Sequence, residues 1–198
     1  MKRDKRSSEI LIEIAHDKKL HGELTFEQIL RLLGDRAFGL AVIFFALPSA
    51  LPISVIPGIS FVFGLPIFLL SIQMIFMRSS LWLPKRVGRI TVDHKTIQKI
   101  VSSSTHYLEK LERFLKPRLS FITSRKMELF NGFFLLCLTF LLMLPIPFSN
   151  YILGTLIIIF SLGLIEKDGI FIITAYVGTI LYLSFIYTII FGVISSIF

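Results

Sequence analysis

LPSALPISVIPGISFVFG, residues 47–64, decides the fold because it bends the middle of a long apolar run. That run, residues 37–77, contains no Asp, Glu, Lys or Arg and is about twice as long as one helical crossing of a bilayer requires. Proline lacks an amide donor and breaks a continuous helix, so the chain has to enter, turn and return. The residues predicted to form this turn are Pro48, Pro52, Pro57 and Gly58.

The predicted turn has only serine hydroxyls as polar side chains, at Ser49, Ser54 and Ser60. A turn in water normally carries Asp, Asn, Lys or Glu, so we expect this one to lie at or near membrane depth. Non-helical backbone in lipid leaves amides unpaired at several kcal/mol each. Other parts of the protein must therefore cover the turn, or it must line a hydrated cavity.

A second interrupted run follows about 90 residues further on. IPGISFVFG at 56–64 aligns with IPFSNYILG at 146–154, and each is followed by a serine, Ser71 or Ser161. This run bends at Pro145 and Pro147. Matched interrupted segments indicate an internal repeat with a binding site at the repeat interface. The alternative is chance similarity between two apolar sequences.

The composition predicts an all-α integral membrane protein, because 54% of the residues are apolar and the three uncharged runs, 37–77, 129–165 and 170–198, make up more than half of the chain. Two Pro-broken helical hairpins, joined by a basic amphipathic cytoplasmic helix, precede a C-terminal transmembrane helix. The predicted divisions are N-terminal helices at 1–36, repeat 1 at 37–78, a linker at 79–128, repeat 2 at 129–169 and the last helix at 170–198.

The net charge of +8 comes from basic residues that flank the membrane runs, at 1–36 and 78–126. This positive-inside pattern places both segments in the cytoplasm of a multi-pass protein of the bacterial inner membrane. No nucleic-acid motif accompanies the charge, so nucleic acid is not an expected partner. The single Cys137 lies in a membrane run and gives no thiolate metal site, and neither a metal nor a cofactor is expected.

Two cytoplasmic elements have recognisable patterns. Thr25 and Gln28 have the spacing of a capping box, which predicts a helix starting at Phe26. Residues 94–116 have a one-sided apolar stripe among Lys and Arg. Such a helix can lie on the anionic leaflet, cap the membrane domain or mediate dimerisation.

Polar residues in or beside the apolar runs are the candidate binding residues. Asp35 and Arg36 act either as an interfacial anchor or as part of an internal polar cluster. Glu166 and Asp168 suit either proton or cation handling or a short charged turn. Gln73 bonds to a neighbouring helix or lines a site. The candidate transport or binding residues are Asp35, Arg36, Gln73, Asn150, Glu166 and Asp168.

These motifs together resemble the ExoD family of membrane proteins of exopolysaccharide synthesis. The matching pieces are LGDRAFGL at 33–40, ALP at 46–48 through PG at 57–58 to FGLP at 63–66, WLP at 82–84, LERFLKPRL at 111–119, LPIPF at 144–148 and EKDG at 166–169. Ser49 and Lys167 stand where the family pattern has Asn and Arg. The resemblance implies an inner-membrane protein linked to exopolysaccharide production, without an established catalytic mechanism.

The interrupted runs, the basic linker and the resemblance together favour two functions. The first is transport or handling of a lipid-linked intermediate, or of a coupling ion, at a site formed by the two Pro-rich turns. The second is a non-catalytic assembly factor that scaffolds a polysaccharide synthesis complex through residues 94–116. The expected partners are the lipid bilayer, a lipid-linked sugar or ion, and a second copy of the chain. No Ser/His, HExxH or paired-Asp arrangement is present, so an enzyme is not expected.

Overall fold

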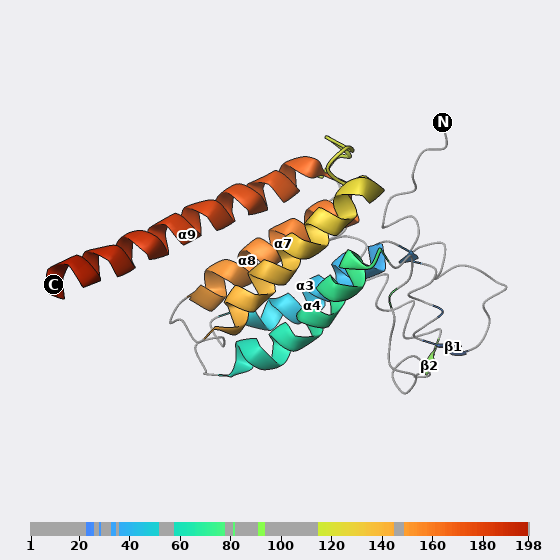
Figure 1. Cartoon of the computed structure of the whole chain (residues 1–198). Helices are drawn as coiled ribbons and strands as arrows, with labels where there is room; N and C mark the ends of the chain where they lie inside the picture. Colours follow the sequence, from blue (N-terminus) through green and yellow to red (C-terminus); the bar gives the residue numbers. More distant parts are fainter. Residues whose placement is uncertain are drawn as a thin grey trace.

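The structure is a computed structural model that describes residues 23–25, 28, 33–34, 36–51, 58–77, 81, 91–93, 115–144 and 149–197. This part of the chain is all-helical apart from one short strand pair, as the long uncharged runs predict. Its five helices (Figure 1) are α3 (Arg36–Ala50), α4 (Ile59–Ile75), α7 (Arg125–Met143), α8 (Ser149–Ile165) and α9 (Gly169–Ile197).

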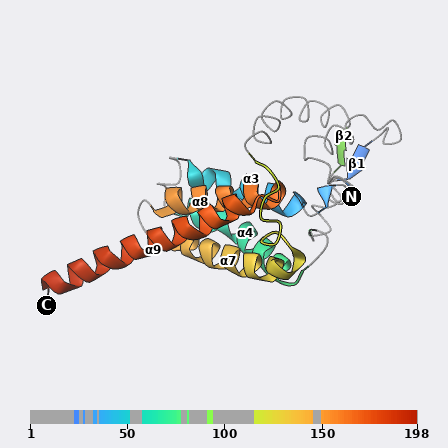
Figure 2. The same cartoon turned by 90° about the horizontal axis from the view of Figure 1, so that it is seen from above.

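Helices α3, α4, α7 and α8 form a four-helix bundle in which neighbouring helices run in opposite directions (Figures 1 and 2). Helix α3 packs mainly along α8, and α4 packs mainly along α7. Helix α9 lies on the outside of the bundle against α8. The last residues of α3 and α7 and the first residues of α4 and α8 lie at one end of the bundle, which we call the tip end (Figure 1).

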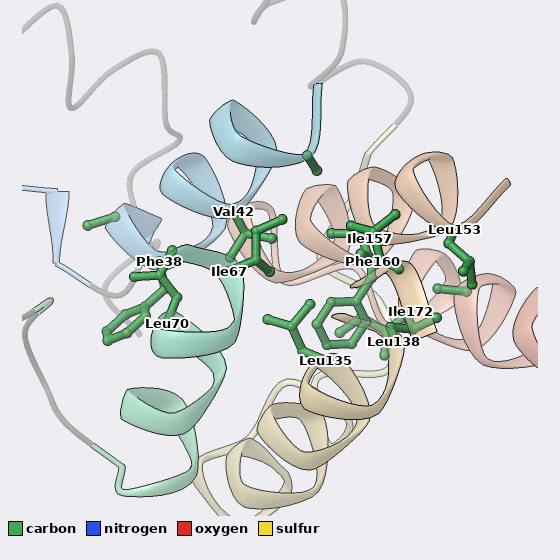
Figure 3. Packing of buried hydrophobic residues seen from close by; sticks show 14 of the residues in the cluster. Phe38, Val42, Ile67, Leu70, Leu135, Leu138, Leu153, Ile157, Phe160 and Ile172 are labelled. Atoms are coloured by element: carbon green, nitrogen blue, oxygen red, sulfur yellow. The ribbon is translucent and has the colours of Figure 1, made fainter. Parts of the chain in front are cut away.

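The bundle is filled by apolar side chains from all four helices (Figure 3). Val42 of α3, Ile67 of α4, Leu135 of α7 and Ile157 of α8 are each at most 1% exposed. Phe160 of α8 is fully buried among them. Interiors packed in this way have few voids, so the four helices share one apolar core.

Glycines determine how closely the helices approach. A Cβ atom on Gly154 of α8 would lie 2.8 Å from the amide nitrogen of Ala50 in α3. A Cβ atom on Gly132 of α7 would lie 2.9 Å from the amide nitrogen of Ile75 in α4. Larger side chains would push these backbones apart, and small residues have the same role at contacts between membrane helices.

Helix α9 is only partly covered by the bundle. Ile172, Ala175 and Tyr182 are buried in its first half, whereas its second half extends past the tip end (Figures 1 and 2). Apolar side chains on that second half are exposed, including Phe185 and Phe191. By length and composition, α7 and the part of α9 from Gly169 to Gly192 are long and apolar enough to cross a membrane.

The segment that precedes the bundle contains the predicted capping box. The Thr25 amide donates to Gln28 Oε1 at 2.9 Å, and the Gln28 amide donates to Thr25 Oγ1 at 3.3 Å, which confirms this prediction. The strands were not predicted: β1 (Glu23–Thr25) pairs antiparallel with β2 (Thr91–Asp93). Strands of three residues are too short to show an alternating pattern.

The predicted amphipathic helix at 94–116 falls largely on residues 94–114, which lie outside the described part. Its last two residues, Leu115 and Lys116, are not helical.

One predicted turn residue belongs to a helix. Pro48 lies in the last turn of α3, which continues to Ala50, so the prediction for Pro48 was wrong. A proline so close to the end of a helix removes one hydrogen bond without breaking a long element. Gly58 has a φ of 93° as the N-cap of α4, a conformation that glycine adopts readily. Pro52, Pro57, Pro145 and Pro147 lie outside the described residues.

Candidate functional site

The charged side chains of the five helices all lie at one end of the bundle. Arg36 is the first residue of α3, and Arg125, Lys126 and Glu128 lie in the first turn of α7. Helices α4, α8 and α9 contain no charged residue, and residues 166–168 follow α8 directly. The starts of α3, α7 and α9 and the ends of α4 and α8 meet here, opposite the tip end (Figure 1). We call this end the charged end.

Arg36 and Glu166 face each other across the α3–α8 contact. Arg36 Nη1 lies 4.0 Å from Glu166 Oε1, and the two side chains are 11% and 10% exposed. Arg36 is beside the C-terminal end of α8 and Glu166 is beside the N-terminal end of α3, so each charge is also favoured by the dipole of the other helix. Arg36 therefore belongs to an internal polar cluster. Asp35 lies outside the described residues.

Asp168 joins three parts of the chain and is only 1% exposed. Its Oδ1 accepts the Ile170 amide at 3.0 Å, which caps α9, and its Oδ2 accepts the Lys116 amide at 3.0 Å. The Asp168 amide donates to the carbonyl of Gly163 at 2.8 Å and closes α8, with Lys167 left-handed at a φ of 53°. Of the two interpretations of this carboxylate, these bonds support the turn; proton handling stays a prediction.

Residues 115–119 pack against the same turn. The Gly169 amide donates to the Arg118 carbonyl at 2.8 Å. A Cβ atom on Gly169 would lie 2.8 Å from Leu119 Cβ and 2.9 Å from the Leu119 carbonyl oxygen, so the contact requires glycine. The LKPRL segment at 115–119 and the EKDG segment at 166–169 are thereby held together.

A cavity of about 440 Å³ lies at the charged end, beside the end of α4 and the start of α7. Its lining includes cationic, carboxylate, amide and hydroxyl groups together with apolar side chains. The lining residues are Phe38, Met74, Met77, Ser120, Thr123, Ser124, Arg125, Glu128, Asn131, Leu164 and Lys167. An amphipathic wall of this kind suits a ligand with a polar group attached to an apolar chain.

Asn131 forms a fixed polar part of the cavity wall. The side chain is 1% exposed, and its Nδ2 donates to the Ile122 carbonyl at 2.9 Å. Its Oδ1 accepts the hydroxyl of Tyr176, whose ring packs edge-on against Phe134 with centroids 4.3 Å apart. Because both ends of the amide are bonded, Asn131 keeps one orientation and connects α7 to α9.

The structure brings only some of the predicted residues together. Arg36, Glu166 and Asp168 all lie at the charged end, and the partly buried Gln73 lies in the last turn of α4, near the same end. Asn150 lies in the first turn of α8, at the tip end.

The tip end also holds buried hydroxyl groups. Ser49 is 0% exposed and Ser60 is 5% exposed, and in the described structure neither Oγ makes a hydrogen bond. Most buried polar groups in proteins have a hydrogen-bond partner, so two buried hydroxyl groups without one are unusual. They make the tip end a second candidate location for polar contacts with a ligand.

None of the predicted binding residues within the described part lines the cavity, and its polar residues Arg125, Asn131 and Lys167 were not predicted from the sequence. Asn131 did have a signal, because an amide inside an apolar run usually bonds to a neighbouring helix. Arg125 and Lys167 resemble ordinary flanking basic residues. They come from segments about 40 residues apart, so only the packing of α7 against α4 and α8 places them around one cavity.

The fold and site define an all-helical protein with membrane-length apolar helices and an amphipathic cavity at its charged end. The family model described as "Exopolysaccharide synthesis, ExoD" matches residues 7–188. The chain belongs to the ExoD family, as its motifs implied, and the family is linked to exopolysaccharide synthesis.

Two curated relatives support this assignment. Protein ExoD of Rhizobium meliloti (strain 1021) is 34% identical over 157 residues, which are 77% of this chain and 65% of the relative. An uncharacterized protein of Synechocystis sp. is 35% identical over 144 residues, 72% of this chain and 68% of the relative. The chain thus spans less than two thirds of the length of the rhizobial protein. No solved structure matches the chain.

Proposed function

We propose that the protein is a multi-pass inner-membrane protein that handles a lipid-linked intermediate of exopolysaccharide synthesis. The outer surface of the bundle supports membrane insertion. Phe44 of α3, Phe61 of α4 and Phe133 of α7 are 67%, 55% and 57% exposed. In the most apolar 18-residue stretch of each helix, only 33% of α7 and 28% of α9 is buried. A core helix of a soluble protein is mostly buried. A helix that is apolar on all sides suits lipid.

Helix lengths support short hairpin arms and one full crossing. Helix α7 has the length of a membrane span, but its first turn is charged and only its last 15 residues, 129–143, are uncharged. At about 1.5 Å per residue, the 15 residues of α3 reach about 22 Å and the 17 residues of α4 or α8 about 25 Å, less than the roughly 30 Å of a bilayer core. The 29 residues of α9 reach about 43 Å. The charged end and residues 1–36 then lie in the cytoplasm, the tip end lies within the bilayer, and α9 crosses with a tilt.

The two hairpins are copies of one unit. The bounds of α8 are those of α4 shifted by 90 residues, and both helices are followed by a residue with left-handed φ, Met77 at 49° and Lys167 at 53°. The ends of α3 and α7 correspond at a shift of 93 residues. Under that shift the buried positions Phe38, Gly39, Val42, Ala46 and Ser49 correspond to Asn131, Gly132, Leu135, Thr139 and Leu142.

The same shifts relate the close contacts of the two helix pairs. Gly154 approaches Ala50, and the matched Gly64 approaches Met143, where a Cβ atom would lie 2.9 Å from Met143 Cγ. Gly39 approaches Ile165, and the matched Gly132 approaches Ile75. These equivalences support a pseudo-twofold axis along the bundle, and therefore repeats of the same orientation rather than inverted ones.

One observation carries the functional proposal: the cavity at the charged end is lined by both charged and apolar side chains, on a bundle covered by apolar side chains. Lipid-linked sugars combine a charged linkage with a long hydrocarbon, so such a ligand can reach the cavity from the cytoplasmic leaflet. Transport from there would proceed toward the hydroxyl groups of Ser49 and Ser60 at the tip end.

The test is movement of a labelled lipid in proteoliposomes. A prenyl-phosphate sugar with a fluorescent group is incorporated in both leaflets, and an impermeant reductant removes the fluorescence of the outer leaflet. The protein should increase the fraction that is reduced over minutes, whereas protein-free liposomes should retain about half of the signal. A protein that leaves the reduced fraction unchanged would contradict the proposal.

A further inference from the structure

One pair of equivalent positions is charged in one half of the protein and apolar in the other. Arg36 and Glu166 form an ion pair where α3 contacts α8 at the charged end. The shifts of 93 and 90 residues place Leu129 and Phe76 at the equivalent positions of the α4–α7 contact. These side chains are 51% and 74% exposed, and neither lines the cavity. The cavity is lined by Met74 and Met77 at the end of α4 and by three residues of α7, so it lies on the side that has Leu129 and Phe76 in place of the ion pair.

The cavity wall is suited to an anion. Arg125 and Lys167 contribute two positive charges against the single negative charge of Glu128. The first turn of α7 adds the positive end of a 19-residue helix, because Arg125 is its first residue. The hydroxyl group of Ser120 is a further donor, whereas the Thr123 hydroxyl already donates to the Ser120 carbonyl. Phosphate oxygens are the acceptors that guanidinium, ammonium and hydroxyl donors bind most effectively together.

The surroundings of the cavity are suited to a lipid rather than to a free anion. The apolar lining residues are Phe38, Met74, Met77 and Leu164. Next to the cavity, Phe121 is 68% exposed and Leu119 is 51% exposed, on a segment that also carries Arg118 and Arg125. Exposed apolar residues among basic ones are typical of a segment that lies in the headgroup layer of an anionic membrane.

We infer that the cavity binds the phosphate group of a membrane lipid, with Arg125 and Lys167 as its charge partners and Met74 and Met77 against the first part of the chain. This inference rests on the proposed function and identifies the cytoplasmic-side site of the lipid-linked intermediate. Asn131 is an uncharged part of the cavity wall, and its hydrogen bonds to Ile122 and Tyr176 hold it in one orientation.

Binding is measured on the full chain in phosphatidylcholine nanodiscs, with farnesyl phosphate as the probe. Farnesol and inorganic phosphate are the comparison probes, because the first lacks the phosphate and the second lacks the chain. Farnesyl phosphate should bind at least about tenfold more tightly than either. The R125Q and K167N variants should each weaken binding about tenfold, since one charge-assisted hydrogen bond is lost. Asn tolerates the left-handed conformation of residue 167.

K126Q is the matched control, because Lys126 is adjacent to Arg125 and exposed but does not line the cavity. It should stay within about twofold of the unchanged protein. Thermal unfolding of each variant shows whether the bundle is intact, and K167N provides an independent result if R125Q fails to fold. Equal binding of farnesol, or equal weakening by K126Q, would overturn the inference.

The proposed function and this inference fail separately. Specific binding without lipid movement in proteoliposomes would reject transport and keep the site. Lipid movement that R125Q and K167N leave unchanged would keep the function and reject this site.

Discussion

Glu166 and Arg36 form an ion pair in which both side chains are about 90% buried, at the junction of the end of α8 and the start of α3. The two residues are 130 positions apart in the sequence. From this pair to the tip end, neither α3 nor α8 contains another charged residue. The pair therefore closes one side of the bundle at the boundary between the polar and apolar parts of the protein.

Removing one partner of this pair should destabilise the protein more than removing both. E166L or R36M alone leaves a buried charge with less compensation and should cost about 3 kcal/mol of unfolding free energy. The double variant should recover at least half of that loss. Thermal unfolding of the four proteins in the same detergent measures this coupling. Additive losses would show that the two side chains act independently.

Closely packed glycines should be intolerant of alanine. G154A places a Cβ atom 2.8 Å from the backbone nitrogen of Ala50, which cannot rotate away, so the expected loss is about 2 kcal/mol. G192A is the matched control, because a Cβ atom on Gly192 in α9 has nothing within 4 Å. It should be neutral or raise the stability by up to about 1 kcal/mol, since alanine favours helix. Equal melting temperatures for G154A and the unchanged protein would disprove the close approach of α8 to α3.

The carboxylate of Asp168 should hold residues 115–119 on the turn after α8. D168N keeps an oxygen that can cap α9 but places an amide group near the Lys116 amide, so only one of two hydrogen bonds is retained. Hydrogen exchange at Lys116 should become at least about tenfold faster, while exchange in α9 changes little. D168A should lose both bonds and accelerate exchange in the first turn of α9 as well. Unchanged exchange at Lys116 in D168N would contradict the observed contact.

Much of the fold could be predicted from the sequence, and the reasons are physical. Long uncharged runs broken by proline can only form apolar hairpins, so the arms around Pro52 and Pro147 and the last helix were predictable. The position of Pro48 was not, because a proline in the last turn of a helix and a proline just after it look alike in sequence. The β1–β2 pair, with three residues in each strand, has no periodic pattern at all.

The candidate site was less predictable, because it is made by packing rather than by a motif. The sequence left Glu166 and Asp168 with the same two alternatives, ion handling or a charged turn, whereas in the structure Glu166 pairs with Arg36 and Asp168 caps α9. The cavity combines Arg125 with Lys167, and nothing in their local sequence distinguishes them from Lys126. Which flanking basic residue lines a cavity depends on the contact between α7 and its neighbours.

The central claim, that both hairpin tips lie within the bilayer, is tested by cysteine labelling in sealed vesicles. In a C137S background, L51C and L144C place single thiols at matched positions after α3 and α7, both exposed on the protein surface. K126C and S195C serve as reference sites at the charged end and near the end of α9. A bulky impermeant maleimide should label K126C only from the cytoplasmic side and S195C only from the opposite side, and it should label L51C and L144C from neither. Rapid labelling of both tip cysteines from either side would place the tips in solvent and contradict the account.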